Sequence, residues 1–215
     1  LFRSRPKLCV GLHVALNAEW ESPRWGPVLP PEQVPSLVDE NGHFWPTPMH
    51  TFERGVDLDQ AMREIKAQLD QARDHGLSIR YIDEHMGVGW IHPKESDAVR
   101  LGELVQRLAQ DEGLLWHGLI PELPSAEALG LASPTAEATA RELLLARLDW
   151  AKPGAYLMYL HPAHDGDEMR AASFPGGPKG VIAAERAADF ALATDGELAR
   201  ALAERGIRSV RYDEA

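Results

Sequence analysis

The sequence has little cysteine and no long apolar run. Cys9 is the only cysteine among 215 residues, so no disulfide can form within the chain. It lies in a predicted strand, where a lone thiol is typical of a small buried hydrophobic residue in a reducing compartment. No apolar stretch approaches the roughly 20 residues that span a bilayer, and no signal peptide is recognisable. We therefore expect a cytoplasmic protein with no membrane partner.

Basic residues are also scarce. Lys and Arg number 22 against 33 Asp and Glu, which gives a net charge of −11. Surfaces that bind nucleic acid need clustered Lys and Arg, so this balance argues against a nucleic-acid partner and favours a neutral or cationic substrate. With 44% hydrophobic and 26% charged residues, the chain is long enough to bury its own core. We interpret residues 1–215 as a single domain.

Apolar runs of strand length alternate with segments of helical periodicity. The predicted strands are residues 7–12, 78–83, 114–120, 155–160 and 207–212. The predicted helices are residues 57–76, 94–111, 133–150 and 194–206. Asp57 caps the first helix and Gly76 ends it, whereas Thr194 and Glu197 form a capping box for the last. The alternation predicts an α/β fold with a mostly parallel sheet.

Three of the predicted strands end in a histidine. These residues are His13, His85 and His161. Because the carboxyl ends of parallel strands share one edge of a sheet, the pattern predicts a metal or acid/base site at that edge. Each histidine also has a simpler interpretation. His13 is then a core histidine bonded to backbone, the acids before His85 are solvated charges, and His161 lies in a polar turn.

The long segment of residues 19–48 has no clear period and is rich in aromatic residues. Long loops of this kind are often functional. Trp20, Trp25 and Phe44 are candidate sugar-binding residues, because an aromatic face can stack on a sugar ring. The alternative is that the loop is anchored by its own buried aromatic side chains.

Several segments together resemble a known family, the YdjC/ChbG-like carbohydrate deacetylases, and within it the HpnK-like branch. The segments that carry the resemblance are VGLHVAL at 10–16, PSLVDENGHF at 35–44, EIKAQL at 64–69, YIDEHMG at 81–87, LHPA at 160–163 and RAADF at 186–190. The resemblance implies a TIM-like, incomplete (β/α) barrel that carries a metal-dependent deacetylase. One divalent ion would be held by an aspartate and two histidines.

The two histidine ligands carry over to His13 and His85. The family's aspartate belongs to an N-terminal Asp-Asp pair, and no acidic residue precedes Glu19 here. Since the chain begins at Leu1 rather than at a methionine, we expect the first β/α unit and this pair to lie upstream. A second departure is Glu84, which stands where the family has serine and changes the charge beside His85.

The remaining roles follow from the resemblance and from the chemistry of amide hydrolysis. His161 is the expected acid for the departing amine. Arg186 and Asp189 either orient the reacting groups or form a structural ion pair. Asp83 and Glu84 are expected to orient the metal-binding histidines. Two histidines and an aspartate suit Zn²⁺, Co²⁺ or Ni²⁺ better than Mg²⁺, but all four are candidates.

Three functions are compatible with these residues. The first is removal of an N-acetyl group from an amino-sugar or a short oligosaccharide. The second is a carbohydrate-binding or regulatory protein without catalysis, which the absent Asp-Asp pair favours. The third is hydrolysis of a different amide or ester, because the metal centre does not fix the acyl group's carrier. We expect a small carbohydrate as partner, and a homodimer is compatible with the sequence.

Overall fold

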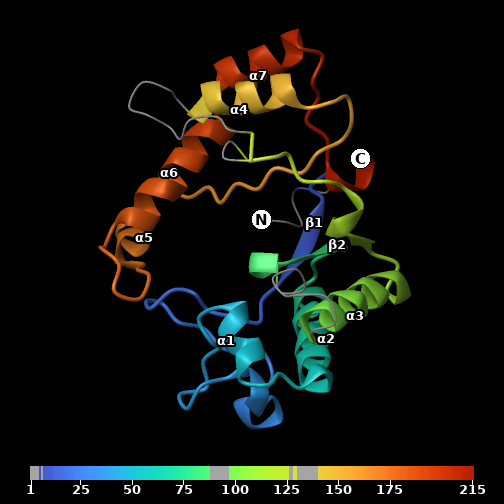
Figure 1. The fold of residues 1–215 in the computed structure, drawn as a ribbon, viewed down its shortest axis with the longest axis vertical. Helices are drawn as coiled ribbons and strands as arrows, with labels where there is room; N and C mark the ends of the chain where they lie inside the picture. Colours follow the sequence, from blue (N-terminus) through green and yellow to red (C-terminus); the bar gives the residue numbers. More distant parts are fainter. Residues whose placement is uncertain (1–4, 6, 88–96, 126–127, 130–139) are drawn as a thin grey trace. The chain divides into compact units, whose positions relative to one another are not determined.

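The computed structural model describes residues 5, 7–87, 97–125, 128–129 and 140–215. The described chain divides into two compact units. Unit 1 comprises residues 1–119 and 211–214, and unit 2 comprises residues 120–210 and 215. The ribbon in Figure 1 is coloured along the sequence, so the first segment of unit 1 runs from blue to green, its residues 211–214 are red, and unit 2 runs from yellow-green to red. The single-domain organisation stays a prediction.

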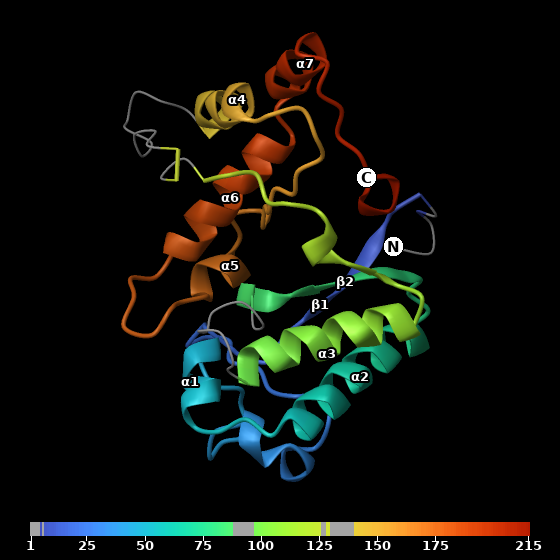
Figure 2. The ribbon, with the colours of Figure 1, turned by 45° about the vertical axis from the view of Figure 1, so that its right-hand side comes forward.

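Unit 1 is built on a parallel sheet of three strands. They are β1 (Val10–Val14), β2 (Ile79–Glu84) and β3 (Leu115–Trp116), in the order β1-β2-β3. Helices α2 (Leu58–Asp74) and α3 (Asp97–Asp111) precede β2 and β3 in the chain. Figure 2 shows the two helices side by side against the strands. The parallel α/β prediction is confirmed, and the incomplete barrel stays a prediction.

Helix α2 forms where local chemistry predicts it. The Asp57 side chain accepts hydrogen bonds from the backbone N–H groups of Asp59 and Gln60, which satisfies two donors of the first turn. Gly76 ends the segment with a φ of 79°, a left-handed conformation that favours glycine. The buried face of α2 packs on the sheet and contributes to the core of unit 1, which includes Val14, Leu16, Phe44, Ala61, Ile65, Ile82, Leu101 and Val105.

Unit 1 also contains short helical segments. They are α1 (Pro48–Glu53), η2 (Pro31–Gln33), η3 (Pro35–Leu37), η4 (His85–Gly87), η5 (His117–Leu119) and η6 (Tyr212–Glu214). The last of these returns to the sheet, where Tyr212 stacks on Tyr81 with ring centroids 4.4 Å apart. The Tyr81 ring lies over Gly11, and a Cβ atom there would approach the ring to 2.3 Å. Glycine is therefore required at this point of β1.

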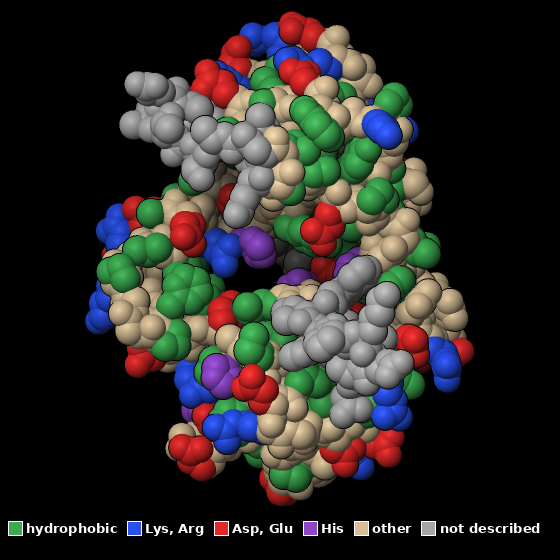
Figure 3. All heavy atoms as spheres, in the orientation of Figure 1, with side chains coloured by type: hydrophobic (Ala, Val, Ile, Leu, Met, Phe, Trp, Pro, Cys, Tyr) green, Lys and Arg blue, Asp and Glu red, His purple; other side chains and the backbone are tan. Residues whose placement is uncertain are grey.

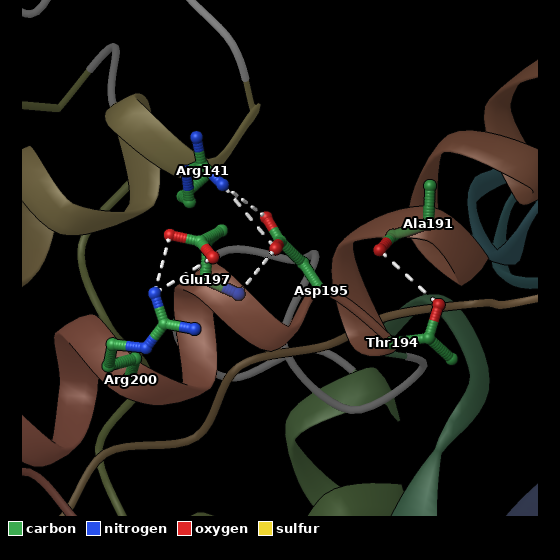
Figure 4. A network of polar contacts seen from close by, with 6 residues as sticks. All are labelled: Arg141, Ala191, Thr194, Asp195, Glu197 and Arg200. Carbon is green, nitrogen blue, oxygen red and sulfur yellow. Dashed lines mark hydrogen bonds and ion pairs between the residues drawn. The ribbon is translucent and has the colours of Figure 1, made fainter.

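Unit 2 is mainly helical. Its helices are α4 (Ala140–Trp150), α5 (Asp167–Ala171), α6 (Val181–Ala193) and α7 (Gly196–Glu204). A small core forms around Leu123, Leu144 and Leu198. Asp195 caps α7 by accepting from the N–H of Glu197, and it also pairs with Arg141 at 3.0 Å (Figure 4). This contact ties α4 to the start of α7.

Several predicted elements are wrong. Residues 155–160 and 207–212 do not form strands, and the predicted strand at 114–120 is reduced to β3. Residues 155–160 contribute only an isolated bridge between Leu157 and Glu122. A strand needs a neighbour to complete its ladder, and alternating apolar residues do not supply one. The sequence pattern also did not predict α6. The starts of the second and third predicted helices, at 94–96 and 133–139, lie outside the described residues.

The cap of the last helix is one residue later than predicted. The Thr194 hydroxyl donates to the carbonyl of Phe190 at 2.8 Å, so it closes α6 instead of opening α7. Figure 4 shows it turned back toward α6. Because so few residues separate the two helices, Asp195 is left to act as the N-cap.

The surface agrees with the charge balance of the sequence. On the face drawn in Figure 3, Lys and Arg side chains lie scattered among Asp and Glu side chains and form no continuous basic area. Among the described helices, none has the length and apolar character needed to cross a membrane.

Candidate functional site

Strand pairing brings the first candidate ligand next to a carboxylate. In the register of β1 and β2, His13 lies opposite Asp83, so their side chains project from the same face. His13 Nδ1 is 3.0 Å from Asp83 Oδ1. This hydrogen bond raises the pKa of His13 above its ordinary value of 6.5, although burial alone would lower it. Asp83 therefore holds the ring of His13 by one nitrogen, as an orienting residue would.

His85 begins the turn that ends β2. The next residue, Met86, has a φ of 54°, and it is the one non-glycine residue with a positive φ in the described chain. Asn17 supports this turn, because its side-chain amide nitrogen lies 3.1 Å from Met86 Sδ and 3.3 Å from the carbonyl oxygen of Pro46. Left-handed backbone at a bulky residue is uncommon and is found at functional sites. The tight turn fixes the backbone from which His85 projects.

The two histidines meet through opposite ring nitrogens. His85 Nδ1 is 3.2 Å from His13 Nε2, with the ring planes at 78°. The other nitrogen of His85, Nε2, lies 2.8 Å from Glu19 Oε2. Each imidazole thus directs one nitrogen toward the other ring and one toward a carboxylate. Metal-binding histidines show this pattern, in which the nitrogen that does not bind the ion is held by an oxygen acceptor.

The spacing of these nitrogens fits a shared cation. Two nitrogen ligands of one tetrahedral zinc ion, each about 2.1 Å from it, lie about 3.4 Å apart, close to the distance between His13 and His85. Within the described residues, however, no group of three or more His, Cys, Asp or Glu side chains is arranged to hold a metal. The described chain therefore offers two imidazole donors for an ion and not a complete ligand set.

The aromatic residues of the long loop divide into two groups. Trp25 packs edge-on against His85 with centroids 6.2 Å apart, and Trp20 packs on Trp25 at 5.8 Å. Both tryptophans are half-buried. Phe44 is 1% exposed and lies in the core of unit 1. Its assignment as a sugar-binding residue is wrong, because no face of its ring is open to a ligand.

Glu84 points away from the face that carries His13 and Asp83. Residues alternate along β2, so Glu84 and Asp83 lie on opposite faces of the sheet. The Glu84 carboxylate is buried, 3.9 Å from His117 Nε2, and that histidine is also buried. The expectation that Glu84 orients a metal-binding histidine stays a prediction, and the contact shown by the structure is with His117.

The remaining candidates lie in unit 2. His161 is exposed and lies in a loop, so the prediction that it ends a strand is wrong. Its backbone N–H donates to Asp189 Oδ2 at 2.8 Å, and the N–H of Ala163 donates to the carbonyl of Arg186 at 3.1 Å. Among the described residues no ion pair joins Arg186 to Asp189. Residues from α6 therefore fix the backbone of the loop that carries His161.

Glu19 is the site residue that the sequence pattern did not reveal. In the sequence it marks only the start of the long loop. Its contact with His85 joins residues 66 positions apart, so no local spacing could reveal it. The one available signal was its place just beyond the strand that carries His13, at the edge where the histidines were expected.

Comparisons with known proteins agree with the sequence resemblance. A family model described as YdjC-like protein matches residues 1–204. A carbohydrate deacetylase from Thermus thermophilus is 30% identical over 212 residues, covering 91% of this chain and 74% of that protein. A carbohydrate deacetylase from Enterococcus faecalis is 38% identical over 85 residues, which is 40% of this chain and 30% of that protein.

A solved structure is similar over nearly the whole chain. It is a crystal structure from Enterococcus faecalis, provisionally described as a cellobiose-phosphate cleavage protein. The TM-score is 0.74 at 24% identity, and the match covers 99% of this chain and 80% of that one. At this identity the likeness concerns the fold alone.

Proposed function

We propose that this chain, which belongs to the YdjC-like protein family, removes the N-acetyl group from an amino-sugar or a short oligosaccharide. Its relatives include carbohydrate deacetylases at about 30% identity. The observation that carries the proposal is the pairing of His13 Nε2 with His85 Nδ1 at 3.2 Å. The other nitrogen of each ring contacts a carboxylate, Asp83 for His13 and Glu19 for His85. The narrower assignment to the HpnK-like branch stays a prediction.

The two described donors, the imidazole nitrogens of His13 and His85, suit a divalent ion. His13 and His85 would hold the ion, and Asp83 and Glu19 would orient the two rings. When bound, such an ion polarises an acetyl carbonyl and makes water a stronger acid. Zn²⁺, Co²⁺ and Ni²⁺ suit imidazole nitrogen better than Mg²⁺ does.

The other groups have roles in binding and proton transfer. Trp20 and Trp25 would contact the sugar beside His85. Hydrolysis adds water across the C–N bond of the acetamide, so the departing nitrogen must gain a proton. We assign that proton to His161, whose loop Asp189 holds by the backbone. Arg186 would support the same loop, because its carbonyl accepts from Ala163.

A second candidate function rests on one observation. The described residues offer two imidazole donors and not a complete ligand set. A carbohydrate-binding or regulatory protein, which would use the same pair of histidines without hydrolysis, is therefore the second candidate. The two functions predict different outcomes when an N-acetylated sugar is mixed with the protein.

Acetate release tests the proposal. The protein is incubated with N-acetylglucosamine and its short oligomers in the presence of Zn²⁺, Co²⁺, Ni²⁺ or Mg²⁺, and free acetate is measured. Metal-dependent release that is lost in His85→Ala supports the deacetylase. Binding of the sugar by calorimetry without acetate release with any of the ions contradicts it and supports the second candidate.

A further inference from the structure

Glu19 contacts the outer nitrogen of one of the paired histidines. Its Oε2 atom lies 2.8 Å from His85 Nε2, and the His85 and Glu19 side chains are 17% and 16% exposed, respectively. A charged hydrogen bond that is this short and largely shielded from water is stronger than one at the surface. The contact therefore restricts the orientation of the His85 ring.

The backbone around Glu19 is fixed on both sides. Gln68 holds Ala15 by both backbone groups, donating to its carbonyl at 2.8 Å and accepting from its N–H at 3.2 Å. Further along, Glu64 accepts from the N–H groups of Val28 and Leu29 at 2.8 and 3.0 Å. Gln68 and Glu64 are neighbours on one face of α2 and bond to each other at 2.9 Å.

Glu19 itself lies between these two fixed points. Just before it, the N–H of Ala18 donates to the carbonyl of Trp45 at 2.8 Å. Glu64 is fully buried, and its carboxylate accepts the hydrogen bonds from the N–H groups of Val28 and Leu29. Glu19 is thus presented to His85 by an anchored segment and not by a free loop.

The contact selects one tautomer of His85. A carboxylate only accepts hydrogen bonds, so the nitrogen that faces Glu19 must carry the proton. The lone pair of neutral His85 is then on Nδ1, the atom that faces His13. By the same reasoning Asp83 places the proton of His13 on Nδ1 and its lone pair on Nε2. Two lone pairs that face each other at 3.2 Å repel unless a proton or a cation lies between them.

We propose that Glu19 is a positioning residue that fixes His85 as the Nε2-protonated tautomer, so that its Nδ1 joins His13 Nε2 in binding one divalent cation. The proposal rests on the proposed function, because it takes these histidines as the metal-binding pair. In this arrangement Glu19 acts through the ring of His85 and is not itself a ligand of the cation.

The tautomer of His85 is measured on the metal-free protein. Two-bond ¹H–¹⁵N correlation spectra of the imidazole rings separate the two neutral forms at a pH above the histidine titration. Glu21→Ala is the control for Glu19→Ala. Each substitution removes one negative charge from the same segment, but Glu21 is exposed. We expect the Nε2-protonated form in the parent and in Glu21→Ala and a mixture of tautomers in Glu19→Ala. An unchanged spectrum for His85 in a folded Glu19→Ala protein overturns the proposal.

Zinc affinity gives a second readout. By titration calorimetry with Zn²⁺, Glu19→Ala is expected to bind about 10–100-fold more weakly than the parent, which is the usual loss when such a supporting group is removed. Glu19→Gln keeps an acceptor oxygen and the shape of the side chain, so we expect its His85 to keep the parent tautomer. It should lose less affinity than Glu19→Ala. Equal affinity of all three proteins overturns the proposal.

The two measurements separate this proposal from the proposed function. A parent protein that binds no divalent ion contradicts the metal centre of the proposed function, while the spectra still decide whether Glu19 sets the tautomer. If Glu19→Ala does not fold, Glu19→Leu, which keeps the bulk of the side chain without an acceptor oxygen, decides the matter. Mixed tautomers of His85 in folded Glu19→Leu support the proposal, and the parent tautomer contradicts it.

Discussion

The two units hold their candidate histidines in different ways. In unit 1 the imidazoles of His13 and His85 are held by the carboxylates of Asp83 and Glu19, through the ring nitrogens themselves. In unit 2, Asp189 accepts a hydrogen bond from the backbone N–H of His161. The first arrangement orients a lone pair, as a metal ligand requires. The second positions the backbone of a loop.

The sharpest test of this difference is removal of the paired imidazoles. His13→Ala or His85→Ala should abolish binding of divalent ions with little loss of folding, because each variant removes one of two donors. Metal content of the purified proteins is measured by emission spectroscopy. His75→Ala, at the exposed end of α2, is the control and should keep the parent content. Full occupancy in both site variants would refute the assignment.

Substitution of His161, in unit 2, should lower turnover without removing the metal. His161→Ala is expected to keep the metal and to lower acetate release by about 10²–10⁴-fold, the usual contribution of a general acid. Metal content and turnover are measured on the same preparation. His164→Ala, three residues along the same loop, is the matched control. Unchanged turnover in His161→Ala would remove it from the acid role.

The stability of unit 1 depends on the buried anchor of the long segment. Glu64→Leu leaves the N–H groups of Val28 and Leu29 without their acceptor. We expect the free energy of unfolding to fall by about 2–4 kcal/mol, since each unsatisfied buried donor costs about 1–3 kcal/mol. Urea denaturation measures this change. Arg200→Ala in unit 2, which breaks an exposed ion pair with Glu197 (Figure 4), should leave stability unchanged. Equal effects of the two substitutions would contradict the comparison.

The smallest expected effect concerns the pKa of His13. Asp83 raises this pKa, so Asp83→Asn should lower it in an NMR titration of the metal-free protein. A raised folded-state pKa stabilises the fold below the ordinary value of 6.5, and this contribution is lost as the pH rises through the folded-state pKa. The stability difference between parent and variant should therefore shrink with rising pH. A difference that grows with pH would contradict the contact.

Local chemistry made part of the fold predictable. The start of α2 at Asp57, its end near Gly76 and a strand at residues 78–83, observed at 79–84, each follow from a short stretch of sequence. The placement of His13 and His85 together followed from the rule that parallel strands end at one edge. That rule needs only the direction of the strands and not their detailed packing.

The rest depended on tertiary contacts. Residues 155–160 have a strand-like pattern but only one bridge partner, and pattern alone cannot supply a ladder. Phe44 looked like a surface aromatic because it lies in a loop, yet it is buried in the core that includes α2 residues. Glu19 reaches His85 from a segment that α2 anchors on both sides.

In the proposed metal centre, His13 Nε2 and His85 Nδ1 bind one cation. Anomalous diffraction from crystals of the zinc-loaded protein tests this most directly. We predict a zinc peak within bonding distance of both of these atoms. A peak bound to other residues, or one that contacts neither histidine, would contradict it.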